Sequence, residues 1–321
     1  MSGGNGKGGI PVGIFERQLL PPISPPPPPR RPLALPLVLF LLTVISTLAV
    51  GAQFALAYQQ GRAPVLFDVN PYAAILSDAS LLLLGIPFSF TLLGILLAHE
   101  LGHYFACRFY RIQASYPYFI PAPTLIGTMG AFIRIRTPIV NRTALFDVGL
   151  AGPIVGFLFA VPALAIAIAA SKLAPQAQAD SLVTFGSPPL LSLLAAVIRP
   201  GVAPEDLLLH PVGRAAWVGL FATALNLLPV GQLDGGHILY ALDSRHHRRI
   251  SLAFIFLLLP LGIFYWPGWL VWAVLLSLLG FRHPALLDRW EPLDPRRRIW
   301  AALALLVFLL CFTPQPFALH D

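Results

Sequence analysis

The chain is built around the stretch Leu96-Leu97-Ala98-His99-Glu100-Leu101-Gly102-His103-Tyr104-Phe105, in which an H-E-x-x-H pentad ends a long apolar run. On an α-helix, His99 and His103 leave the same face one turn apart, the spacing that two nitrogen ligands of one tetrahedral zinc ion need. Glu100 is then placed to take a proton from a zinc-bound water. Ionisable residues inside an apolar run are energetically expensive and usually functional. The pentad therefore predicts a metal site, and another segment must supply a third ligand.

The composition indicates an integral membrane protein. Of the 321 residues, 57% are hydrophobic and only 11% are charged, whereas a soluble domain has about 25% charged residues. The formal net charge is +7, but the arginines flank apolar runs, so they indicate membrane topology rather than nucleic-acid binding. The two cysteines, Cys107 and Cys311, predict neither a disulfide framework nor a cysteine metal site.

The pattern of charge-free runs predicts an all-α polytopic membrane protein with about six or seven transmembrane helices. Residues 1–31 are rich in glycine and proline and predict a disordered cytoplasmic tail, leaving 32–321 as the membrane-embedded domain. The predicted spans cover residues 33–57, 81–108, 148–171, 215–233, 250–281 and 299–313. Pro87 either kinks the second span or marks its beginning.

The run 250–281 is longer than one span and contains internal Pro and Gly, so it is either one overlong helix or a tight hairpin of two. The hairpin gives seven spans with a cytoplasmic N-terminus and places seventeen of the 21 Lys and Arg residues on the inner side. A single helix would move the last five to the outside. We therefore expect the hairpin, and the pentad then lies toward the cytoplasmic side of the cell membrane.

Residues 112–142 differ from the rest of the chain. The alternation from Phe132 to Arg136, together with Gly127 and Gly130, predicts a small β-hairpin or edge-strand element after the second span.

Asp234 is the candidate third ligand, because it is a carboxylate in an apolar context at the end of another predicted span. Gly235 and Gly236 allow the backbone to turn sharply there. Taken alone, Asp234 is equally suited to be a helix N-cap. His237 is either a partner of the ligands or an interfacial residue.

Together, His99-Glu100-x-x-His103 and Asn226-x-x-Pro229-x-x-x-x-Asp234-Gly235 resemble the motifs of the site-2 protease family of intramembrane zinc metalloproteases. The resemblance covers roughly residues 80–243. It implies one zinc ion per chain, held by His99, His103 and Asp234. It also implies that Glu100 is the general base and then the proton donor to the leaving amine. Asn226 would polarise the scissile carbonyl or hold the substrate strand.

The predicted hairpin matches an extended element of the same family that can pair with substrate. An unwound transmembrane segment can add to an edge strand by main-chain hydrogen bonds, and Gly127, Gly130, Ala131 and Phe132 are the candidate substrate-binding residues. The alternative is that the hairpin is a structural loop. The chain has no room for the PDZ or CBS domain that many family members carry, so it resembles the minimal members.

The leading functional prediction is a zinc-dependent intramembrane endopeptidase that acts in regulated proteolysis or clears membrane remnants. Its partners would be transmembrane protein or peptide substrates and the lipid bilayer. The alternative is a metal-ion transporter or binding protein, and a third possibility is a non-catalytic scaffold. Glu100 discriminates between the first two, because hydrolysis needs a carboxylate placed as a base and a transport site does not.

Overall fold

The structure is a computed structural model that describes residues 33–62, 78–174, 183–281, 283, 284, 286 and 292–319. The predicted tail, residues 1–31, lies outside the described residues. From Ala34 onward the chain belongs to one compact unit.

The unit is mostly helical, as predicted. The earlier helices are α1 (Ala34–Gln59), the 3-10 helix η1 (Ala79–Gly85), α3 (Ile86–Phe109), which carries the pentad, and α4 (Arg142–Ala170). The later helices are α6 (Pro189–Ile198), η2 (Pro204–Asp206), α7 (Pro211–Asn226), α8 (Asp234–Leu242), α9 (His247–Phe264), α10 (Gly268–Leu279) and α11 (Pro295–Cys311).

Four helical segments in the described part of the chain are long and apolar enough to cross a membrane: Ala34–Gln59, Ala79–Phe109, Arg142–Ala170 and His247–Phe264. Helix α7 has 16 residues, α10 has 12 and α11 has 17, and each is shorter than the roughly 20 residues of a full span. The structure therefore supports an integral membrane protein, and the count of six or seven spans stays a prediction. Pro87 lies in the first turn of α3, near its beginning, and does not kink its interior.

The predicted span at 215–233 is wrong at both ends, because α7 covers Pro211–Asn226. The helix ends early since Pro229 has no backbone N–H and disfavours helical geometry in the residue before it. Gly231 then adopts a φ of 56°, which turns the chain toward α8. For the run 250–281 the hairpin prediction is correct: α9 and α10 are separate helices that pack together.

In the part of the chain that the structure describes, the strands form three two-stranded antiparallel sheets. The predicted hairpin is present as β1 (Tyr118–Pro121) and β2 (Thr128–Phe132), with Phe119 opposite Ala131. The alternation from Phe132 to Arg136 predicted extended structure up to Arg136, but β2 ends at Phe132. Beyond it, an isolated bridge joins Ile135 to Ala114. The pairs β3 (Lys172–Leu173) with β5 (Leu207–Leu208), and β4 (Val183–Phe185) with β6 (Phe317–Leu319), had no clear sequence signal.

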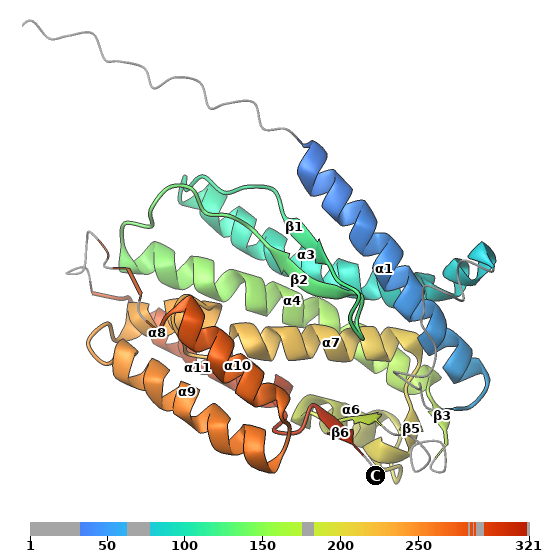
Figure 1. Cartoon of the computed structure of the whole chain (residues 1–321). Helices are drawn as coiled ribbons and strands as arrows, with labels where there is room; N and C mark the ends of the chain where they lie inside the picture. Colours follow the sequence, from blue (N-terminus) through green and yellow to red (C-terminus); the bar gives the residue numbers. More distant parts are fainter. Residues whose placement is uncertain are drawn as a thin grey trace, which may run out of the picture. The chain divides into compact units, whose positions relative to one another are not determined.

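Helices α3, α4 and α7 pack against one another, with α1 beside α3 and the β1–β2 hairpin against α1 (Figure 1). The α3–α4 contact is very close. A Cβ atom on Gly102 would lie 2.6 Å from the carbonyl oxygen of Ala151 and 3.1 Å from the Cα of Gly152. Gly102 and Gly152 therefore allow the two helices to approach closely, and the pentad lies directly against α4.

We expect Gly102→Ala to destabilise the protein, because the added methyl would meet the α4 backbone, which cannot move aside. Overpacking of this kind costs about 1–3 kcal/mol. The measurement is thermal unfolding in detergent. The control is Gly94→Ala in the same helix, where the methyl would have nothing within 4 Å; equal stability of the two variants would contradict the close contact.

Candidate metal centre

The structure brings the three candidate ligands together from two distant parts of the chain. His99 and His103 lie on α3, and Asp234 is the first residue of α8. The two histidine Nε2 atoms are 3.0 Å apart, and each is 3.3 Å from Asp234 Oδ2. Both imidazoles are buried, with 5% and 7% of their residue surface exposed.

The geometry fits a tetrahedral metal ion. Ligand atoms bound to zinc at about 2.0–2.1 Å stand about 3.3 Å apart along each edge of the tetrahedron. His103 Nδ1 lies 2.7 Å from the carbonyl oxygen of Val148. Since a carbonyl only accepts, Nδ1 carries the proton and the lone pair of Nε2 points toward His99 and Asp234. Two imidazole nitrogens and a carboxylate oxygen that converge in a buried site form a set that could hold a metal ion.

The turn between α7 and α8 places Asp234. The N-cap of α8 is Leu233, so Asp234 is not the N-cap residue that the sequence also allowed. A Cβ on Gly235 would lie 2.1 Å from the carbonyl oxygen of Leu227, and one on Gly236 would lie 2.4 Å from that of Gly231. The two glycines therefore let the start of α8 pack directly against the backbone of the segment that joins α7 to α8, as their sequence position suggested.

Two glycines of α4 accommodate the histidine rings. A Cβ on Gly152 would lie 2.1 Å from His103 Nε2, and one on Gly156 would lie 3.1 Å from the Cβ and Nδ1 of His99. The sequence analysis did not assign these glycines to the site. Their G-x-x-x-G spacing was the available signal, because it is typical of helices that approach closely.

Glu100 and His99 both line a cavity of about 900 Å³. Most of its wall is apolar and includes Val50 from α1, Phe221 from α7 and Trp272 from α10. Glu100 is buried, with 5% of its surface exposed. A carboxylate beside the three ligands and at the cavity wall is placed for proton transfer to a group bound there.

Asn226 also lines this cavity, and its Nδ2 lies 3.3 Å from His99 Nε2. An amide N–H donor therefore stands beside the metal site, as the candidate role of Asn226 requires.

The hairpin residues divide into two groups. Gly130 and Ala131 line the cavity together with Thr128 and Met129 of the same strand, and the latter two were missed in the sequence analysis. Gly127 instead lies against α1, where its carbonyl accepts a 2.6 Å hydrogen bond from Ser46 Oγ. Phe132 stacks on Tyr118 within the hairpin. The structure thus brings Gly130 and Ala131 to the site and not Gly127 or Phe132.

Among the described contacts, His237 makes no hydrogen bond to Asp234. Its Nδ1 instead lies 2.9 Å from Nε2 of His283. His283 Nδ1 donates to the carbonyl of Pro284 at 2.7 Å, so its Nε2 accepts from His237. Burial lowers the pKa of His283, which favours this neutral form.

Residues 87–264 match the sequence profile of Peptidase family M50. This match covers more than half of the chain, and the chain therefore belongs to that family, which is the site-2 protease family of zinc metalloproteases predicted from the motifs. No solved structure matches the chain significantly.

Curated relatives agree with this family. The probable zinc metalloprotease EGY1, chloroplastic, of Arabidopsis thaliana is 31% identical over 87% of this chain and 52% of its own length. The rice protein of the same name (Oryza sativa subsp. japonica) is 31% identical over 87% of this chain and 50% of its own. The probable zinc metalloprotease EGY2, chloroplastic, of Oryza sativa subsp. indica is 33% identical over 68% of this chain and 41% of its own. The chain thus spans about half the length of the curated relatives it matches.

We expect Gly152→Ala to weaken metal binding strongly, because the methyl would clash with His103 Nε2 at 2.1 Å. Gly156→Ala should have a smaller effect, since its methyl would lie at a tight but tolerable 3.1 Å from His99. Zinc content after dialysis measures both. Retention of zinc by Gly152→Ala at the wild-type level would contradict this description of the site.

Proposed function

We propose that this chain is a zinc-dependent endopeptidase that hydrolyses peptide bonds of transmembrane substrates within or near the membrane. The observation that carries the proposal is the convergence of His99, His103 and Asp234 beside Glu100, with His99 and Glu100 on the wall of a mostly apolar cavity. Membership of the site-2 protease family supports it, and so do the apolar helices around the site.

Each residue of the site has a defined part in this reaction. His99, His103 and Asp234 hold the metal, which when bound supplies Lewis acidity and lowers the pKa of water. Glu100 takes the proton from the attacking water and passes it to the nitrogen of the leaving amine, so the proton is neither gained nor lost. The Asn226 amide donates to the scissile carbonyl and stabilises the negative charge that develops on its oxygen.

We further propose that the substrate lies extended along β2. Its amides are exposed only after its helix unwinds, because helical backbone groups are hydrogen-bonded to one another. Among the described residues, β2 pairs with β1 and leaves its other edge for a substrate strand. The strand residues Thr128, Met129, Gly130 and Ala131 share the cavity with His99 and Glu100, so a paired substrate would pass the metal centre.

In this proposal, residues 32–321 form the membrane-embedded protease domain with its core at 80–243, and residues 1–31 are a cytoplasmic tail. The chain crosses the cell membrane seven times with the active site toward the cytoplasmic side, and it acts in regulated proteolysis or in clearing membrane remnants. The basic residues near the predicted inner ends of the spans support this orientation.

Glu100→Gln should retain zinc, because Glu100 is not one of the three ligands, but should cleave a transmembrane reporter about 10²–10⁴-fold more slowly, because the general base is lost. The measurement compares reporter cleavage and zinc content with wild type, and membranes of cells with the variant should accumulate uncut substrates. A Glu100→Gln protein that keeps zinc and cleaves at the wild-type rate would rule out the protease and favour metal binding or transport.

The topology predicts opposite labelling of two introduced cysteines. In intact cells, Arg62→Cys should react with a membrane-impermeant maleimide, and Arg245→Cys should react only after the membrane is permeabilised. The two native cysteines are buried, which keeps the background low. The reverse pattern would place the active site on the other side of the membrane.

A further inference from the structure

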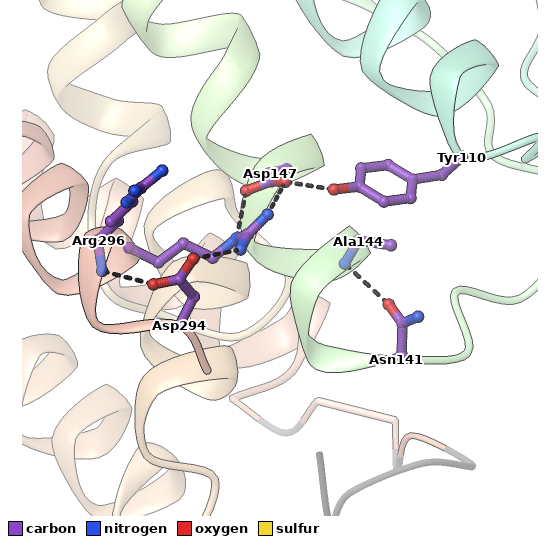
Figure 2. Close-up of polar contacts among 7 residues, drawn as sticks. Tyr110, Asn141, Ala144, Asp147, Asp294 and Arg296 are labelled. Carbon is purple, nitrogen blue, oxygen red and sulfur yellow. Dashed lines mark hydrogen bonds and ion pairs between the residues drawn. The ribbon is translucent and has the colours of Figure 1, made fainter. Parts of the chain in front are cut away.

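One carboxylate joins the ends of three helices near the metal centre. Asp147 on α4 accepts two hydrogen bonds from Arg297 on α11, at 2.9 Å from Nε to Oδ1 and 2.7 Å from Nη2 to Oδ2. The hydroxyl of Tyr110, the C-cap residue of α3, donates to Asp147 Oδ2. Figure 2 shows Tyr110 reaching Asp147, with Asp294 and Arg296 at the start of α11 nearby.

The arrangement is more than a solvated surface pair. The guanidinium binds both carboxylate oxygens in the bidentate geometry that makes such pairs strong and directional. Only 22% of the Arg297 side chain and 28% of the Asp147 side chain are exposed. Asp147 is also the one acidic residue of α4, and its pair with Arg297 joins the first turns of α4 to α11.

The next two residues of α4 touch the metal centre. The carbonyl of Val148 accepts the hydrogen bond that orients His103. Gly149 lies against α8, where an added Cβ would be 3.1 Å from the carbonyl oxygen of Asp234. Residues 147, 148 and 149 therefore connect Arg297 to two of the three candidate ligands within one helical turn.

We propose that Asp147 and Arg297 are positioning residues for the metal centre. By holding the first turns of α4, their ion pair keeps the Val148 carbonyl in line with His103 Nδ1 and keeps Gly149 seated on α8. Arg297 lies on α11, outside residues 87–264 that match the family profile, and it reaches the metal centre through α4. This inference rests on the proposed function only in requiring that His99, His103 and Asp234 bind a metal.

The test compares Arg297→Gln with wild type and with Arg199→Gln as a matched control. Arg199 is also an arginine that binds α4, but at its opposite end, where Nη2 donates to the carbonyls of Ala169 and Ser171 at 2.6 and 3.0 Å. The readouts are the visible absorption spectrum of the cobalt-substituted protein, zinc loss to a chelator, and kcat and KM for a reporter. Thermal unfolding is measured for all proteins.

Arg297→Gln should alter the cobalt spectrum and weaken metal binding about 10–100-fold, as for other residues that orient ligands. It should also lower kcat by a larger factor than the factor by which KM changes. Arg199→Gln should leave the spectrum and the metal affinity at wild-type values even if it unfolds at a lower temperature. An Arg297→Gln protein with the wild-type spectrum and zinc affinity would show that the ion pair only stabilises the fold, and would overturn the proposal.

If Arg297→Gln does not fold, Asp147→Asn decides, because it removes the carboxylate charge of the ion pair and keeps an oxygen that can accept from Tyr110. A shift of the cobalt spectrum and zinc affinity in the same direction supports the proposal, and wild-type values overturn it. Failure of this inference can be distinguished from failure of the proposed function. If the wild-type protein binds no metal, the metal centre itself is refuted.

Discussion

The metal centre depends on the close contact between α3 and α4. Helices approach this closely only where side chains are absent, and Gly102 and Gly152 provide that space on the two helices. The contact brings the His103 ring to the Val148 carbonyl. A helical carbonyl has a second lone pair, so it can accept from the imidazole while it remains bonded within the helix. In an apolar setting this bond also satisfies an N–H that has no water to bind.

The contact makes the third ligand possible. With His103 held against α4, its Nε2 faces the side on which α7 ends and α8 begins. The turn between those helices is compact because Gly235 and Gly236 lie on its backbone, and it delivers Asp234 to within 3.3 Å of both histidines. Asn226 at the end of α7 and Asp234 at the start of α8 thus reach the same site from either end of the turn.

In the proposed function, the surroundings of the site suit a substrate that arrives from lipid. The cavity beside His99 and Glu100 is mainly apolar, which suits the side chains of a transmembrane segment, while the edge of β2 offers hydrogen bonds to its main chain. Polar chemistry is confined to a few buried groups at one wall. The helices that follow the turn add support, and α11 binds the same turn of α4 that orients His103.

The sequence by itself determined the membrane class, the pentad helix, the candidate ligands and the family, because these depend on local spacing and on the cost of charge in apolar runs. It also indicated the hairpin and the two-helix form of 250–281. It misjudged the extent of α7 and β2, where a proline and a turn end regular structure. Only the tertiary structure decided which groups orient the ligands: Val148, Gly152 and the Asp147–Arg297 pair act through packing between distant helices. Those contacts have no periodic signal, since a backbone carbonyl or a missing side chain becomes part of a site only when another helix is placed against it.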